Sequence, residues 1–279
     1  MELLRALGTL AEQPDVHTAD LARLVGLDPP TPEEWHATFV ERFYPYASVH
    51  LGQQGFLGGP VRDGVAGVLD TIGARVAQEA DHLAVLLDAF AHVDERGWVP
   101  GRAVLLWEHI LPWTLPYLDR VALEGAGPFR DWAQLLSAVL ADTAERVPRP
   151  SGAELVLVEE PDGLPDPRLD GEDDLVQALL APARYGAILT RDDLLLAAGR
   201  LDLAPRVGER RYVLRALLQQ DPAGTLGWLA DHARAADDRT RTWPEVAGHL
   251  AAWWSSQATR SADLLNDLAD DARTAKAVA

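Results

Sequence analysis

The chain has 279 residues, with 43 acidic and 25 basic side chains and no cysteine, and its formal net charge at pH 7 is −18. The lack of cysteine excludes thiolate nucleophiles, cysteine-ligated zinc and disulfide frameworks, because each needs the sulfur atom. The negative charge opposes binding to nucleic acid and to anionic membranes and attracts cationic segments, so we expect a basic peptide as partner and no nucleic acid.

Helical patterns follow one another along nearly the whole sequence. The segments TPEE at Thr31 and TWPE at Thr242 have the spacing of capping boxes with proline in the first turn, and each predicts a helix start. Apolar residues at helical spacing between positions 65 and 76 and between 83 and 90 indicate two helices that face a core. We expect further helices at 1–12, 18–26, 33–51, 101–122, 128–146, 173–181, 191–200, 208–219, 223–236 and 243–274. In the stretch 101–122, Pro112 and Pro116 should kink or break the helix.

Composition divides the chain into two helical parts. Residues 148–172 are rich in proline, glycine and acidic side chains, which favour turns and extended backbone. This segment is therefore predicted to be a linker between a helical domain at 1–147 and a helical C-terminal extension at 173–279. The one β-like run, at 154–158, has no partner strand, so we expect a loop there and an all-α fold.

Neither a membrane segment nor a reaction centre is evident. The most apolar stretch, 103–123, is interrupted by prolines and charged residues, and the N-terminal segment lacks the continuous apolar run of a secretory signal. We therefore expect a cytoplasmic protein without stable membrane insertion. The eight histidines never occur at metal-ligand spacing and no GxSxG motif is present, so we predict no catalytic residue, no metal site and no cofactor.

One predicted helix carries a line of carboxylates. Asp81, Asp88 and Glu95 recur every seven residues, whereas Leu83 and Phe90 belong to the apolar side. We expect these carboxylates to be exposed and able to hold guanidinium groups of a basic peptide. The same pattern is also typical of an ordinary solvated helix face.

Four short segments between positions 43 and 117 occur in a recognisable order. They are FYPYASVHL at 43–51, GFLGG at 55–59, EADHL at 79–83, and LWEHILPW at 106–113 followed by PY at 116–117. This ordered set resembles the TorD/DmsD/NarJ family of cytoplasmic redox-enzyme maturation chaperones over about residues 35–146, although Ala47 stands where that family often has glutamate. The resemblance implies a TorD-like helical bundle that binds the leader peptide, often a twin-arginine signal, or the apo form of a molybdopterin oxidoreductase until its cofactor is inserted.

The resemblance also indicates a peptide-binding groove. Its motifs match YxS, DH and HxxxW at three pairs of residues, namely Tyr46 with Ser48, Asp81 with His82, and His109 with Trp113. The predicted groove residues are Tyr46, Ser48, His50, Asp81, His82, Asp88, Trp107, His109 and Trp113. The histidines among them could instead be structural, with hydrogen bonds to backbone carbonyls, and the tryptophans could be core residues.

Two other functions fit the sequence. The chain could be a helical scaffold or regulatory protein that binds no leader peptide. It could also be an enzyme that holds a phosphate-bearing ligand in the glycine-rich loop between Gly52 and Gly64. The sequence predicts neither the identity of the client nor the oligomeric state.

Overall fold

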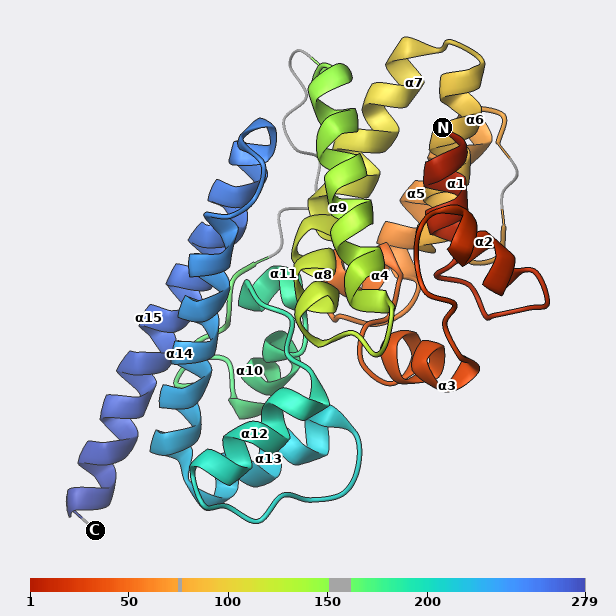
Figure 1. Cartoon of the computed structure of the whole chain (residues 1–279). Helices are drawn as coiled ribbons and strands as arrows, with labels where there is room; N and C mark the ends of the chain where they lie inside the picture. The colour runs from red at the N-terminus through yellow and green to blue at the C-terminus, as the bar shows by residue number, and fades with distance from the viewer. Residues whose placement is uncertain (75–76, 151–161, 279) are drawn as a thin grey trace. The chain divides into compact units, whose positions relative to one another are not determined.

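The computed structural model describes residues 1–74, 77–150 and 162–278 (Figure 1). Within these ranges the backbone is helical with connecting turns, and the extended segments pair at one isolated antiparallel bridge, between Tyr46 and His82. The predicted all-α fold is therefore confirmed, while the β-like run at 154–158 lies outside the described residues. In the described part of the chain, no helix is both long and apolar enough to cross a membrane.

The chain separates into two compact units. Unit 1 comprises Met1–Gly52, Phe56–Glu160 and Pro244–Ala247, and unit 2 comprises Gln53–Gly55, Pro161–Trp243 and Gly248–Ala279. Residues 151–161, within the predicted linker at 148–172, lie outside the described ranges, so the domain boundaries drawn from the sequence stay a prediction.

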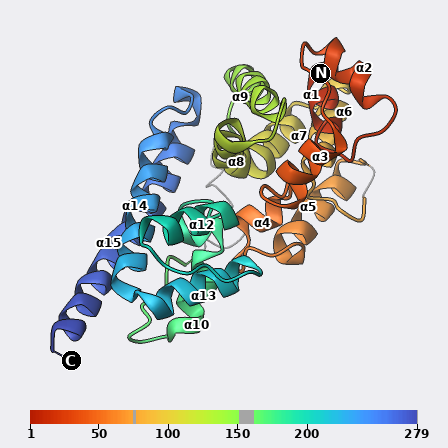
Figure 2. The ribbon, with the colours of Figure 1, turned by 60° about the horizontal axis from the view of Figure 1, so that its bottom comes forward.

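Unit 1 holds the segments that carry the resemblance. Its helices are α1 (Glu2–Thr9), α2 (Thr18–Leu24), α3 (Pro32–Trp35), η1 (His36–Val40), α4 (Ala47–Leu51), α5 (Gly59–Thr71), α6 (Leu83–Glu95), α7 (Val99–Val104), η2 (Leu105–Ile110), α8 (Leu111–Glu124), α9 (Phe129–Arg146) and the short η3 (Glu245–Ala247). Helices α1 and α6 pack together, as do α8 and α9 (Figures 1 and 2). A Cβ atom on Gly8 of α1 would lie 3.2 Å from Cα of Ala84 in α6, so glycine permits this close approach.

The single helix predicted at 33–51 is wrong. The capping box at Thr31 is present, since Thr31 accepts a hydrogen bond from the Glu34 amide and the Glu34 side chain accepts one from the Thr31 amide. The helix nevertheless ends in the π-helical turn η1, and helical structure resumes only at Ala47. Pro45 explains the interruption, because it has no amide hydrogen and disfavours the helical conformation at the residue before it.

The proline pair in the next long stretch changes the type of helix. Residues 99–124 run as α7, the π-helix η2 and α8 in direct succession. Pro112 lies in the first turn of α8, directly after the π-helical segment, and Pro116 lies inside α8. The wider π-helical turns thus lie directly before Pro112, which has no amide hydrogen to donate to the preceding turn.

Unit 2 is built around a helical hairpin. Its helices are α10 (Glu172–Leu179), α11 (Pro182–Tyr185), α12 (Arg191–Arg200), α13 (Arg210–Gln220), α14 (Pro222–Thr240) and α15 (Gly248–Val278). Helices α14 and α15 run side by side in opposite directions (Figures 1 and 2). Buried leucine and alanine side chains of α14 and α15 share one apolar core with residues of α10, α12 and α13. Tyr185 is fully buried there, and its hydroxyl donates to the Leu229 carbonyl at 2.7 Å.

The start of α15 differs from the expectation in one respect. The second predicted capping box does not form, because the Thr242 hydroxyl donates back to the Arg239 carbonyl and α15 begins only at Gly248, after the short η3. Of the adjacent tryptophans, Trp254 is buried at 1% exposure, Trp253 is half-buried, and the two rings meet edge to face.

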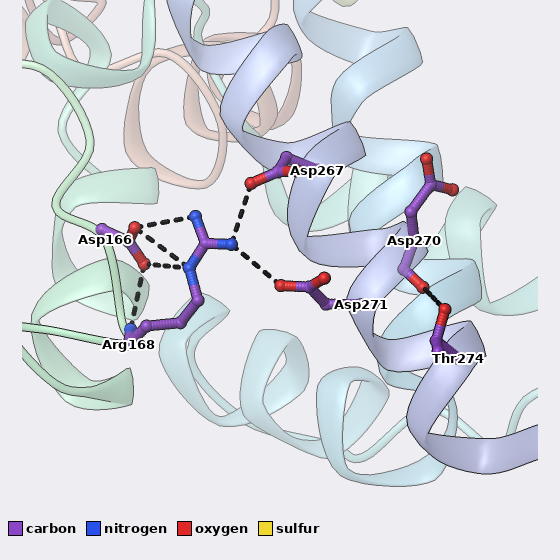
Figure 3. Close-up of polar contacts among 6 residues, drawn as sticks. All are labelled: Asp166, Arg168, Asp267, Asp270, Asp271 and Thr274. Atoms are coloured by element: carbon purple, nitrogen blue, oxygen red, sulfur yellow. Dashed lines mark hydrogen bonds and ion pairs between the residues drawn. The ribbon is translucent and has the colours of Figure 1, made fainter. Parts of the chain in front are cut away.

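An arginine ties the segment before α10 to α15 (Figure 3). The Arg168 guanidinium contacts Asp166 in its own loop and both Asp267 and Asp271 of α15, each at 2.8 Å. These hydrogen bonds raise the pKa of Arg168 and lower the pKa of Asp166. Because Arg168 belongs to the loop before α10 and both Asp267 and Asp271 belong to α15, the cluster holds a loop against a helix.

Candidate functional site

Two of the segments that carry the resemblance meet at the isolated bridge in unit 1. Tyr46 and His82 pair there in antiparallel fashion. The Leu83 amide donates to the Pro45 carbonyl at 2.9 Å, and the Ala47 amide donates to the Asp81 carbonyl at 3.0 Å. The bridge therefore fixes the start of α4 beside the start of α6, although the two segments are more than thirty residues apart in the sequence.

Asp81 stabilises the N-terminus of α4. Its carboxylate is buried at 2% exposure and accepts a hydrogen bond from the Ser48 amide at 2.9 Å. Together with the Asp81 carbonyl, it satisfies two of the amides that an α-helix leaves unpaired at its first turn. The expectation that Asp81 lies on an exposed acidic helix face is wrong, because α6 begins only at Leu83.

His82 begins α6 in the same way. Its backbone is extended and its Nδ1 atom accepts from the Ala84 amide at 3.1 Å, so the ring is the N-cap of α6. Burial lowers the pKa of His82, which favours the neutral ring that this hydrogen bond requires. The half-buried Tyr46 ring packs edge to face against His82, and its hydroxyl donates to Glu79 at 2.9 Å.

Ser48 fastens the glycine-rich loop. The Ser48 side chain is fully buried, and its hydroxyl accepts from the Gly58 amide at 3.0 Å. Gly58 and Gly59 have φ values of 87° and 73°, a region that favours glycine. The neighbouring Phe56 and Leu57 side chains are about 60% exposed.

The aromatic residues of the predicted groove form a buried stack. His50 stacks on Trp113 at 5.3 Å between ring centroids, and Tyr117 contacts both rings. The His50 Nε2 atom lies 2.9 Å from the Tyr44 carbonyl oxygen. Trp107 is also buried, and its indole donates to the Val147 carbonyl at 2.8 Å.

The nine predicted groove residues thus differ in their access to solvent. Six are buried, namely Ser48, His50, Asp81, His82, Trp107 and Trp113. Tyr46 and His109 are half-buried, and burial lowers the pKa of His109 to about 4. Asp88 alone is exposed, with 68% of its side chain accessible.

Asp88 lies on an open cleft between α1, α6 and the segment before α6. The cleft has a volume of about 680 Å³. Small apolar side chains line it, namely those of Ala74, Ala77, Ala84, Val85 and Ala89, and polar or charged side chains flank them, namely Arg5, Glu12, Asp88 and His92. Partial desolvation raises the pKa of Glu12, and the charges of Asp88 and Asp15 raise it further. A cation in the cleft would therefore relieve repulsion between carboxylates.

A guanidinium group already contacts the acidic side of this cleft. Arg5 of α1 donates to Asp88 at 2.9 Å and forms a two-pronged contact with Glu95. The sequence analysis missed Arg5 and Glu12 as site residues. Arg5 is 83 and 90 residues from its two partners, and no local pattern indicates that pairing.

No group of three or more histidine, aspartate or glutamate side chains in the described ranges has a geometry that could hold a metal ion. The cleft presents carboxylates beside small apolar side chains. What this arrangement can do is bind: it offers acceptors for guanidinium groups next to a shallow apolar surface.

Comparison with known proteins supports the same conclusion. No curated protein matches the chain in a sequence search. Residues 17–116 match the family model described as nitrate reductase delta subunit, over a little more than a third of the chain. The matched segment runs from α2 through η2 into the first turns of α8, and so it includes both sides of the bridge. The match confirms the resemblance to the TorD/DmsD/NarJ family over residues 17–116, and the members of that family are chaperones for enzyme maturation that are not themselves enzymes.

Proposed function

We propose that this protein is a cytoplasmic chaperone that binds an arginine-containing leader segment of a molybdopterin oxidoreductase precursor before cofactor insertion. The binding site is the cleft between α1 and α6. The observation that carries this proposal is the combination of exposed carboxylates and an alanine-lined surface in one cleft, whose α6 side lies within the matched segment. The family acts on precursors of nitrate reductase-type enzymes, which supports an oxidoreductase as the client.

The negative charge of the cleft favours a cationic ligand. Asp88 is exposed, Glu12 has a raised pKa, and the whole chain carries a net charge of −18. A peptide with two guanidinium groups gains charge-assisted hydrogen bonds from these carboxylates, and the long-range field speeds its approach. The shallow apolar lining beside Val85 and Ala89 accommodates the small hydrophobic residues of a leader.

The other residues predicted from the resemblance have different tasks in this proposal. Asp88 contacts the peptide directly, whereas the half-buried Tyr46 and His109 do not line the cleft. The six buried residues position the elements rather than touch the peptide. His82 caps the first turn of α6 and so positions the wall on which Asp88 lies, and Asp81 fixes the start of α4 beside it.

Titration of the full-length protein with a labelled twin-arginine peptide tests the proposal. Replacement of Asp88 by asparagine should weaken binding about five- to tenfold, because it removes one charge-assisted contact worth about 1–1.5 kcal/mol. The matched control is Asp142→Asn on α9, another exposed carboxylate in unit 1 that pairs with Arg146 and lies outside the cleft.

Binding should also weaken as salt increases, and a peptide with glutamine in place of both arginines should bind at least tenfold more weakly. A folded protein that gives no binding signal with the twin-arginine peptide would favour the alternative, a helical scaffold without a leader site. Equal loss of affinity in the Asp88 and Asp142 variants would show that net charge, and not this cleft, governs binding.

A further inference from the structure

We propose that Arg5 is an internal competitor of the client peptide: its side chain occupies the carboxylates that the client's arginine would bind, and it is displaced when the client binds. The inference rests on the function proposed above and adds its regulation. The Arg5 contact is thus autoinhibitory, because a client segment is held only if it binds tightly enough to displace Arg5.

The geometry of Arg5 is that of a bound guanidinium ligand. Its Nε atom donates to Oδ1 of Asp88 at 2.9 Å, and its two terminal nitrogens contact the two carboxylate oxygens of Glu95, one of them at 2.9 Å. A third carboxylate, Glu2, lies 3.0 Å from Nη1. This planar, two-pronged arrangement is the one by which proteins recognise arginine side chains. It raises the pKa of Arg5 and lowers the pKa of Glu95.

Displacement of the Arg5 side chain leaves its helix in place. Helix α1 is anchored by Leu4 and Leu7, which are buried at 2% and 0% exposure, and by the Trp132 indole, which donates to the Leu7 carbonyl at 2.8 Å. None of these contacts involves the guanidinium. The arginine side chain therefore leaves for water by rotation about its own bonds, in contrast to Arg168, whose contacts hold a loop in place.

The carboxylates are open to exchange. The Asp88 and Glu95 side chains are 68% and 46% exposed, and 26% of the Arg5 side chain is accessible. Exposed pairs of this kind are weak and exchange their partners readily. Arg5 therefore lowers the apparent affinity for a client only moderately, by the fraction of time during which the site is free.

A second carboxylate gives twin arginines an advantage over one. The Glu12 side chain lies on the same cleft, and its pKa is raised by partial desolvation and by the charges of Asp88 and Asp15, with no arginine among the causes. A single client arginine only replaces Arg5 at Asp88 and Glu95. Two arginines replace Arg5 and also neutralise Glu12, so the second contact is an additional gain.

The test compares Arg5→Gln with the wild-type protein in titrations with the twin-arginine peptide and with a peptide that keeps one arginine. The control is Arg146→Gln, which removes the same charge from an exposed pair on α9. We expect Arg5→Gln to bind the twin-arginine peptide about three- to tenfold more tightly and Arg146→Gln to differ from wild type by less than twofold. The fold-gain should be about the same for both peptides, because removal of Arg5 raises the fraction of free site by one factor for every ligand that must displace it, while the twin-arginine peptide stays the tighter ligand of each protein.

Each outcome decides between the two proposals. Equal affinity of wild type and Arg5→Gln would overturn the competitor role and leave the leader site standing. Weaker binding by Arg5→Gln, with an unchanged melting temperature, would also overturn it, since Arg5 would then position the carboxylates for the client. Absence of binding by both folded proteins would overturn the leader site and with it the inference. As an independent readout, the Arg5 Nε–H resonance should shift on addition of peptide to the wild-type protein.

Discussion

Asp81 lies just before α6 and Asp88 lies on α6, and the surroundings of these two carboxylates are opposite. Asp81 is buried at 2% exposure and its acceptor atoms are used by the start of α4, whereas 68% of the Asp88 side chain is open to water. The residues that identify the family segment thus build the junction between α4 and α6. The residues suited to hold a ligand lie one to three turns further along α6 and on α1, where the motifs do not reach.

The largest difference is expected when each carboxylate is removed in turn. Asp81→Ala leaves the Ser48 amide buried without its charged acceptor, so the free energy of unfolding should fall by about 2–3 kcal/mol. Asp88→Ala should change it by less than about 0.5 kcal/mol, because the side chain is exposed. Urea denaturation of both variants measures the two effects. A similar loss in both variants would contradict the comparison.

This comparison also shows what local sequence patterns can predict. The apolar spacing at 83, 86, 87 and 90 predicted α6 correctly, and the capping box at Thr31 is present in the structure. The seven-residue spacing from Asp81 to Glu95 was misleading, because His82 has an extended backbone and ends the periodicity before it reaches Asp81. A pattern of residue types does not reveal where a helix starts when the cap is a histidine.

The cleft could not be predicted for a different reason. Arg5 and Glu12 line it from α1 and the turn after α1. They lie beside α6 because Gly8 packs against Ala84. These contacts join residues more than seventy positions apart, and nothing in the local pattern of either helix marks them. The pairing of the YxS and DH segments joins residues more than thirty positions apart, and only the family resemblance brought these segments into one predicted groove.

Mild acid should destabilise unit 1. Burial lowers the pKa of His109 to about 4 and also lowers that of His82, so the unfolded chain binds more protons than the folded one below the ordinary histidine pKa of about 6.5. The stabilisation is complete above pH 6.5 and declines toward pH 4. We expect His109→Gln to flatten the fall in unfolding free energy between pH 6.5 and 5 by about 1–2 kcal/mol.

The control for this titration is His17→Gln, since the His17 side chain is exposed. Thermal or urea unfolding at several pH values measures the slope for each variant. A His109→Gln protein whose stability falls with pH as steeply as that of wild type would show that His109 is not responsible.

The smallest effect concerns the hydroxyl that links α4 to the glycine-rich loop. Ser48→Ala removes the acceptor of the Gly58 amide, but that glycine is only half-buried and water can replace the hydroxyl, so the loss in unfolding free energy should be about 1 kcal/mol. The local consequence is sharper than the global one: hydrogen exchange of the Gly58 amide should accelerate at least tenfold, while the α6 amides keep their protection. Ser137→Ala on α9 is the control, because it removes a half-buried serine hydroxyl outside the junction between α4 and α6. Unchanged exchange at Gly58 would mean that the positive φ angles of Gly58 and Gly59 hold the loop without Ser48, and the junction would then end at α4 instead of extending to the exposed Phe56 and Leu57.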